Sequence, residues 1–193
     1  EYDCDVILSD DGMQHYRLSR DIELAVVDTQ RKFGNGFCIP AGPLREPVSR
    51  LNKANMVVYH GDCTDKYQFT LQFGDAFNLD TAERKKLESF VPDTVHAVAG
   101  IGHPERFFTQ LRDMGLNIIE HAFPDHHKYT GSDLDFPDDA PILMTEKDAV
   151  KCMPRYPAAK SDGDNRNIWA VPVHAEMSDH LGSDLIALLR QNR

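Results

Sequence analysis

Short apolar runs alternate with helix-like segments along this chain, and this alternation constrains the fold more than any other feature of the sequence. The largely apolar runs lie at residues 6–9, 23–28, 56–60, 95–101, 117–123, 142–145 and 168–173. Runs of this length, rich in β-branched residues, predict buried strands. Because strands that alternate with helices pack as a mainly parallel sheet, we predict an α/β fold.

Helices are expected between these strands, at residues 48–53, 81–90, 104–114, 147–152 and 178–191. The helix at 104–114 is well marked, because Pro104 stands at its first position and Gly115 follows its end. The final helix repeats leucine at the i, i+4 and i+7 spacing of a single helix face. The predicted inner faces of these two helices comprise Phe107, Phe108, Leu111, Leu181, Leu185 and Leu188.

Residues 66–73 follow a different pattern, in which apolar and polar side chains alternate. This period of two predicts a strand with one solvated face, either antiparallel or at the edge of a sheet. We therefore predict two subdomains with a boundary near residues 60–75. Residues 1–60 form the first, residues 61–75 form the linking strand region, and residues 76–193 form a second α/β subdomain.

The acidic composition of the chain limits its partners. The formal net charge is −10, and 41% of the residues are hydrophobic and 27% charged, a balance that excludes a disordered chain. Since nucleic-acid binding needs a basic surface, no nucleic-acid partner is expected. No apolar stretch approaches the ~20 residues of a membrane span. The four cysteines include no C-x-x-C pair, which favours free thiols over a zinc site or a disulfide framework.

Two aspartates, Asp10 and Asp11, directly follow the first predicted strand. A strand that delivers aspartates to its carboxyl end resembles the Walker B arrangement of P-loop enzymes, which holds Mg²⁺ beside the phosphates. Gly12 permits a sharp turn, so that Gln14 and His15 can fold back over the same site. The alternative is a turn in which the aspartates and the glycine serve only backbone geometry and helix capping.

A long segment rich in glycine and proline, residues 29–55, separates the second and third predicted strands, and its length and apolar content favour a functional loop. Near its end stands the sequence GPLREP, at residues 42–47. Arg45 offers a planar donor group for a phosphate, and Glu46 could bind Mg²⁺ or a hydroxyl. The alternative is a rigid turn that leads into a helix, with both residues as surface charges.

Three further polar segments follow predicted strands, at residues 99–105, 123–129 and 144–149. The first departs from the G-x-G-x-x-G fingerprint, so a tight strand-to-helix turn is the better interpretation. The second carries His126 beside Asp125, a candidate general base, base orienter or metal ligand, or else a pair of capping or surface residues. In the third, Thr145 and Asp148 have the capping-box spacing, so we favour a structural role.

Six motifs in this order are more specific than any of them alone: DDGMQHYRLSRD, FGNG, IPAGPLREP, VHAVAGIGHPERFF, FPDHHKYT and MTEKDAVKC. Together, over residues 10–152, they resemble the tetraacyldisaccharide 4′-kinases, the lipid A 4′-kinases of Gram-negative bacteria. The resemblance implies a P-loop kinase that uses ATP and Mg²⁺ to phosphorylate the 4′-hydroxyl of tetraacyldisaccharide 1-phosphate, forming lipid IVA. It also implies a P-loop-kinase-like parallel sheet, incomplete here, and a second α/β/α subdomain, in an enzyme peripheral on the cytoplasmic face of the inner membrane.

The resemblance assigns roles residue by residue. Asp10 falls on a Mg²⁺ ligand, and Asp11 on a residue that supports catalysis. Those that would line the nucleotide and phosphate site are Gln14, His15, Arg45 and Glu46. His126 resembles the histidine that pairs with a catalytic aspartate, the base toward the sugar hydroxyl.

The chain departs from the family because it contains neither G-x-x-x-x-G-K-[ST] nor that catalytic aspartate, which in the family precede DDGMQH. We therefore expect this chain, which begins at Glu1, to be the carboxyl-terminal part of the enzyme and to be inactive alone. Contact with the inner-membrane surface is expected through the missing N-terminal part. Two alternatives remain open: a non-catalytic binding or structural domain, and a Mg²⁺-dependent phosphoesterase that uses Asp10, Asp11 and His126.

Overall fold

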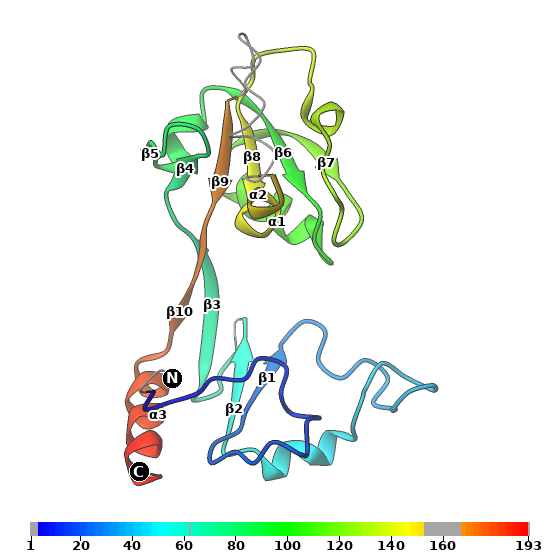
Figure 1. Ribbon diagram of the computed structural model, residues 1–193, viewed down its shortest axis with the longest axis vertical. Helices are drawn as coiled ribbons and strands as arrows, with labels where there is room; N and C mark the ends of the chain where they lie inside the picture. Colours follow the sequence, from blue (N-terminus) through cyan, green and yellow to red (C-terminus); the bar gives the residue numbers. More distant parts are fainter. Residues whose placement is uncertain (1–3, 62, 153–166, 193) are drawn as a thin grey trace. The chain divides into compact units, whose positions relative to one another are not determined.

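The computed structural model describes residues 4–61, 63–152 and 167–192, which build an α/β fold with two β-sheets (Figure 1). The chain divides into two compact units, unit 1 comprising Glu1–Leu71 with Ala175–Arg193, and unit 2 comprising Gln72–His174. Both sheets are mixed, and parallel pairs of strands outnumber antiparallel pairs. The prediction of an α/β fold with mainly parallel strands is therefore confirmed.

The four-stranded sheet has the order β1-β2-β3-β10. This sheet and the helices connected to it are β1 (Leu24–Asp28), the 3₁₀ helix η1 (Val48–Lys53), β2 (Met56–His60), β3 (Gln68–Phe73), β10 (Val173–Met177) and α3 (Asp179–Gln191). β1 pairs with β2 and β2 with β3, both in parallel. β3 and β10 are antiparallel, because Ser178 N donates to Gln68 O and Gly74 N donates to Pro172 O, each at 2.9 Å.

The strand predicted at residues 66–73 is β3, and it lies inside the sheet, between β2 and β10. The prediction that it is antiparallel is correct toward β10, whereas the edge position is wrong. The chain leaves unit 1 within β3, after Leu71, and re-enters it within β10, at Ala175. The last helix, α3, therefore belongs to unit 1. The sequence had placed all of residues 76–193 in one subdomain. Apolar packing explains why α3 belongs to unit 1, because Leu181 of α3 is buried against Met56 and Val58 of β2.

Unit 2 contains the six-stranded sheet, in the order β5-β4-β9-β8-β6-β7. Its remaining elements are β4 (Ala76–Asn78), β5 (Arg84–Lys85), the 3₁₀ helix η2 (Leu87–Phe90), β6 (Thr94–Ala99), α1 (Pro104–Asp113), β7 (Asn117–Ala122), the 3₁₀ helix η3 (Gly131–Leu134), β8 (Ile142–Thr145), α2 (Glu146–Cys152) and β9 (Ile168–Val171). The strands β7, β6, β8 and β9 are parallel neighbours. Their carboxyl ends therefore meet at one edge of the sheet.

Successive strand residues point to opposite sides of a sheet, and in the central strands β6, β8 and β9 both sides are buried. In β8, Leu143 packs into the core cluster that includes Phe108 and Leu111 of α1, whereas Met144 packs into the cluster that includes Ala149 of α2. The predicted inner face of α1 is confirmed, since Phe107, Phe108 and Leu111 are all buried. None of the helices in the described part of the chain has the length and apolar character that crossing a bilayer would require.

The strand predicted at residues 6–9 is wrong. These residues form no ladder with any described strand, and the side chains of Ile7 and Leu8 are 87% and 91% exposed. An apolar run becomes a strand only where a neighbouring strand satisfies its backbone hydrogen bonds. The sequence pattern alone does not provide that partner.

The helix predicted at residues 81–90 is also wrong, apart from the short η2 at its end. The side chain of Asn78 accepts hydrogen bonds from Asp80 N and Thr81 N, at 2.9 and 3.0 Å. These two bonds alone would suit a helix start, but the chain turns back, and Asn78 N donates to Glu83 O at 2.8 Å. Ala82 then has a φ of 58°, and the chain returns as β5, antiparallel to β4. Local turn chemistry and strand pairing thus override the charged, helix-like composition.

Candidate functional site

A tight turn places the first candidate residues of unit 1. Gly12 is buried, and a Cβ there would lie 2.5 Å from Ser9 Oγ, so a larger residue would force the Ser9 side chain to move. Asp11 has a φ of 50°, in the left-handed region, and His15 N donates to Gly12 O at 3.0 Å. The guanidinium of Arg20 donates to Gly12 O and, at 3.3 Å, to Met13 O. The turn is thus held by its own backbone and by one arginine.

Arg45 joins this turn to the GPLREP segment. Its Nη1 donates to both carboxylate oxygens of Asp11, at 3.0 and 2.8 Å, and to Gln14 Oε1 at 3.3 Å. Hydrogen bonding and charge attraction from Asp11 raise the pKa of the Arg45 guanidinium, which therefore stays cationic at any physiological pH. The Nε and Nη2 atoms of Arg45 have no partner among the described residues, and 60% of its side chain is exposed. One side of the guanidinium is therefore available to an anion.

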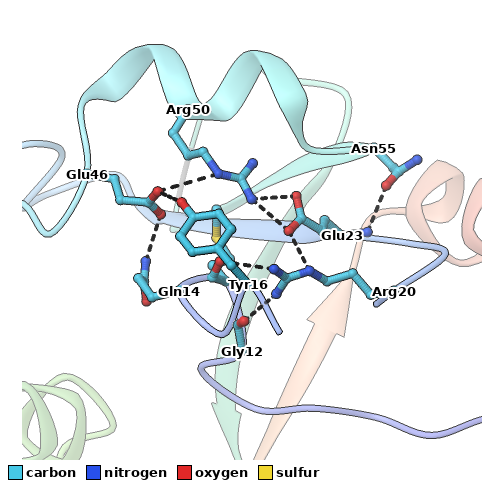
Figure 2. Close-up of polar contacts among 9 residues, drawn as sticks. Gly12, Gln14, Tyr16, Arg20, Glu23, Glu46, Arg50 and Asn55 are labelled. Atoms are coloured by element: carbon cyan, nitrogen blue, oxygen red, sulfur yellow. Dashed lines mark hydrogen bonds and ion pairs between the residues drawn. The ribbon is translucent and has the colours of Figure 1, made fainter. Parts of the chain in front are cut away.

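Glu46 is held by two other side chains of the same turn, Gln14 and Tyr16 (Figure 2). Gln14 Nε2 donates to Glu46 Oε2 at 3.1 Å, and the hydroxyl of Tyr16 donates to Oε1. The Tyr16 hydrogen bond, with smaller contributions from Gln14 and Arg50, lowers the pKa of Glu46. Glu46 is therefore a carboxylate at neutral pH, and Gln14 connects it to the Arg45–Asp11 pair.

Further ionic contacts connect Glu46 to the start of the sheet (Figure 2). Arg50 of η1 donates to both carboxylate oxygens of Glu23, at 2.7 and 2.8 Å, and its Nε lies 3.7 Å from Glu46 Oε1. Arg20 Nε lies 2.8 Å from Glu23 Oε1. Glu23 N in turn donates to Asn55 Oδ1 at 2.7 Å, just before β1 and β2 begin. Glu23 thus ties the turn and η1 to the start of the sheet.

Four residues of this network were not predicted from the sequence: Tyr16, Arg20, Glu23 and Arg50. Tyr16 and Arg20 lie inside the quoted motif DDGMQHYRLSRD, which is the one signal that pointed to them. Arg50 and Glu23 stand 27 residues apart, so their pairing could not be read from local spacing.

The loop before Arg45, residues 35–44, is closely packed and leaves no room for a side chain at Gly42. Asn35 Nδ2 donates to Ala41 O at 2.9 Å, and its Oδ1 accepts from Phe37 N at 3.1 Å. A Cβ on Gly42 would lie 2.1 Å from Asn35 Oδ1 and 2.3 Å from Phe37 O, so no side chain fits there. Ile39 N and Leu44 O are also hydrogen-bonded, at 2.9 Å. This loop fixes the point from which Arg45 reaches the turn.

Two predicted site residues of unit 1 remain outside this network. Asp10 and His15 are exposed, and their side chains make no hydrogen bond or ion pair with any described residue. The structure thus joins Asp11, Gln14, Arg45 and Glu46 to one another, but not Asp10 or His15. A search of the described residues finds no group of three or more His, Cys, Asp or Glu side chains arranged to hold a metal ion. Mg²⁺ in kinases needs only one or two carboxylates besides phosphate oxygens and water, and the unpaired carboxylate of Asp10 fits that requirement.

His126 belongs to unit 2, where the loop after β7 carries it. Its φ of 61° lies in the left-handed region, and 77% of its side chain is exposed. His126 N donates to Asp125 Oδ1 at 3.0 Å, and its Nε2 lies 3.7 Å from Asp125 Oδ2. Lys147 Nζ lies 3.1 Å from Asp125 Oδ1, and this contact is the main reason that the pKa of Asp125 is lowered. An ionised carboxylate therefore lies beside the imidazole.

The TEKDA segment has the capping role that its spacing predicts. Asp148 N donates to Thr145 Oγ1 at 3.2 Å, and the Thr145 hydroxyl donates to Asp148 Oδ2 at 2.7 Å. Asp148 also accepts from Gly100 N at 2.8 Å and from Lys151 Nζ at 2.7 Å, and it is fully buried. Its long-range contact with Gly100 was not predicted, because the two residues come from different motifs.

Comparison with known proteins identifies a family that matches nearly the whole chain. Residues 1–190 match the family described as LpxK, tetraacyldisaccharide-1-P 4′-kinase. A tetraacyldisaccharide 4′-kinase of Nitrosococcus oceani is 46% identical over 190 residues, which cover 98% of this chain and 54% of that protein. One from Azoarcus sp. strain BH72 is 46% identical over 200 residues, covering 99% of this chain and 56% of that protein.

A solved structure shares the fold. The crystal structure of LpxK from Aquifex aeolicus, described as in complex with ATP, superposes with a TM-score of 0.69 and 23% identity, covering 94% of this chain and 56% of that one. The chain thus spans about half the length of the relatives it matches. Because the family match extends over nearly all of its residues, the chain belongs to the tetraacyldisaccharide 4′-kinase (LpxK) family.

Proposed function

We propose that this chain is the carboxyl-terminal part of an ATP-dependent kinase that transfers the γ-phosphoryl group of ATP to the 4′-hydroxyl of tetraacyldisaccharide 1-phosphate. The observation that carries the proposal is the network in which Arg45 bridges Asp11 and Gln14 while Gln14 holds Glu46. It joins the two motifs, DDGMQH and GPLREP, that the family resemblance places at the nucleotide. Family membership supplies the reaction and the lipid substrate.

In this proposal the exposed side of Arg45 binds a phosphate oxygen, while Asp11 keeps the guanidinium pointed at the site. Gln14, His15 and Glu46 line the same phosphate and nucleotide pocket. Asp10 is the Mg²⁺ ligand, directly or through water, because its carboxylate has no competing cation among the described residues. Mg²⁺ would supply neutralisation of the phosphate charge.

His126 acts on the other substrate. We assign it to hold and orient a catalytic aspartate that this sequence does not contain, so that the aspartate can accept the proton of the sugar hydroxyl. The ionised Asp125 attracts the imidazole of His126, whose Nε2 faces Asp125 Oδ2, and so restricts the orientation of the ring. The enzyme then works on the cytoplasmic face of the inner membrane, which it contacts through a part of the protein outside this chain.

These 193 residues contain no G-x-x-x-x-G-K-[ST] sequence, whose backbone and lysine cradle the β- and γ-phosphates in P-loop kinases. We therefore expect the chain alone to transfer no phosphoryl group from ATP to the disaccharide. Sequencing the DNA immediately upstream of Glu1 is the first test, and an in-frame P-loop is the expected result. An initiation codon directly before Glu1 would favour the non-catalytic alternative instead.

The decisive test is Arg45→Met in the longer protein encoded by that reading frame. We expect kcat/KM for phosphorylation of tetraacyldisaccharide 1-phosphate to fall by about 10²–10³-fold, the usual cost of removing one aligned charge donor. Arg112→Met is the matched control, because Arg112 is also an exposed arginine paired with carboxylates, on α1 of unit 2. Equal activity of the two variants would contradict the proposal.

A further inference from the structure

Three motifs of unit 2 converge at the carboxyl ends of its parallel strands. The GIGHPE turn follows β6, the FPDHH loop follows β7, and the TEKDA segment follows β8 as α2. Because β7, β6 and β8 are neighbours in the sheet, their following segments lie at one edge. In sheets of this kind, that edge is where ligands bind.

Asp148 of α2 fixes the first of these segments. Its buried carboxylate accepts hydrogen bonds from Gly100 N, the Thr145 hydroxyl and Lys151 Nζ, all at 2.7 or 2.8 Å. Lys151 Nζ also donates to Gly100 O, at 3.3 Å. Both backbone polar groups of Gly100 are therefore bound by side chains of α2. A buried carboxylate with three donors is a rigid attachment point.

The GIGHPE turn also packs directly on the loop that carries His126. A Cβ built on Gly100 would lie 2.7 Å from the Tyr129 hydroxyl and 3.4 Å from the Cβ of His127, so only glycine fits there. A Cβ on Gly102 would lie 3.7 Å from Asp125 Oδ2. The helix α2 is thus connected to the His126 loop through Gly100 as an intermediate.

Lys147 makes the direct connection. Its ammonium group donates to Asp125 Oδ1 at 3.1 Å, and the same oxygen accepts from His126 N at 3.0 Å. Asp125 Oδ2 faces His126 Nε2 at 3.7 Å. Lys147 therefore fixes a carboxylate that contacts both the backbone and the ring of His126. The side chains of Lys147 and Asp125 are 50% and 43% exposed, so this ion pair adds little to stability.

We propose that Lys147 is a positioning residue for His126, acting through Asp125 from a helix that Asp148 and Lys151 anchor to the GIGHPE turn. The inference rests on the role of His126 in the proposed function. It adds that the TEKDA segment, which the sequence assigned to helix capping, also sets the geometry of the histidine. Lys147 directs the carboxylate, and Asp148 holds the helix from which Lys147 reaches out.

The structural part is tested by nuclear magnetic resonance on the 193-residue chain, comparing Lys147→Met, Lys147→Arg and Lys85→Met. Lys85 is the matched control, since it forms an exposed ion pair with Glu83 elsewhere in unit 2. In Lys147→Met, the pKa of the Asp125 carboxyl should rise toward its ordinary value, and the amide signal of His126 should move. Lys147→Arg should preserve both. An Asp125 titration in Lys147→Met identical to that in Lys85→Met would overturn the proposal.

The catalytic part is tested with the same variants in the longer kinase. We expect Lys147→Met to lower kcat on the order of tenfold with KM for ATP unchanged, while Lys147→Arg stays within about threefold of the original. Melting temperatures should agree within about 2 °C, which excludes a loss through unfolding. An unchanged kcat in Lys147→Met overturns the positioning role. Full activity in His126→Ala would contradict the proposed function itself, so the two failures are distinguishable.

Discussion

The two units differ in how they hold their functional residues. Unit 2 buries both faces of its central strands β6, β8 and β9, with Trp169, Phe108, Leu111 and Leu143 among its fully buried side chains. The buried cluster of unit 1 comprises Met56, Val58 and Leu181 in the described part of the chain, with partly buried neighbours around it. In unit 1 the candidate residues are held by polar side-chain contacts, of which the Arg45–Asp11 pair is exposed and the Arg50–Glu23 pair is largely buried. In unit 2 a fully buried carboxylate, Asp148, lies on a helix that packs into the core.

This contrast separates two ways of ordering polar groups. An exposed ion pair contributes little free energy, so Arg45 and Asp11 depend on Gln14 and on a closely fitted loop to stay in place. Asp148 and Thr145, by contrast, sit where the sheet and α2 are already fixed by apolar burial. We therefore expect unit 1 to be the more adaptable of the two, and the following predictions test that difference in order of decreasing effect.

The largest effect is expected in the core of unit 2. Phe108→Ala should lower the free energy of unfolding by about 3–5 kcal/mol, because it removes a ring that is 98% buried from a close-packed cluster. Chemical denaturation followed by circular dichroism measures the loss. Phe37→Ala is the matched control in unit 1, where the ring is 63% exposed and the cost should stay within about 0.5 kcal/mol. Equal losses would contradict the contrast between the units.

Amide hydrogen exchange compares the units without any substitution. We expect the amides of β1 and β2 to open with a free energy roughly 2 kcal/mol lower than those of β6 and β8, because fewer apolar contacts must be broken. Better protection in residues 24–60 than in residues 94–145 would show that this expectation is wrong.

A smaller effect is expected from Gly42→Ala. The added Cβ would overlap Asn35 Oδ1 and Phe37 O, so the loop must shift at a cost of about 1–2 kcal/mol. The same shift should displace Arg45 and lower the activity of the longer kinase. Gly182→Ala in α3 is the control, since nothing lies within 4 Å of its added Cβ and alanine favours a helix. A destabilised Gly182→Ala with an unaffected Gly42→Ala would contradict this account of the loop.

The smallest effect is a pH dependence of unit 2. Burial, with a smaller contribution from the neighbouring His96, lowers the pKa of His121 below its ordinary value of 6.5. His121 is therefore neutral in the fold, and its contribution to stability is present above pH 6.5 and lost as the pH falls through its folded pKa. Thermal unfolding of His121→Gln should depend less on pH than that of the original as the pH falls below 6.5. A steeper dependence in the variant would reverse this assignment.

The parts of the molecule that could be predicted are those that local pattern decides. β2 and η1 have the predicted bounds, and α1 begins at Pro104 and ends before Gly115, because turn and capping residues act over a few positions. Asp11 and Gln14 were predicted as site residues because they follow residues 6–9, which form no strand, and Arg45 and Glu46 because they lie in a loop rich in glycine and proline. Their grouping therefore rests on turn and loop residues and not on the end of a strand.

Other features depended on partners far away in the sequence. The apolar run at residues 6–9 forms no strand because no described strand pairs with it, and β4, the partner of β5, is itself paired with the distant β9. The return of α3 to unit 1 follows from the burial of Leu181 on β2.

The sequence by itself determined the fold class, the family and the two motifs of unit 1 that meet at Arg45, because periodicity, turn residues and motif order are local properties. Only the tertiary structure decided that Arg45 pairs with Asp11, 34 residues away, and that Glu23 binds two arginines. The same is true of the hydrogen bond from Gly100 N to Asp148, 48 residues away. Such pairings arise from the packing of whole elements, which sets the distance between side chains that no local spacing connects.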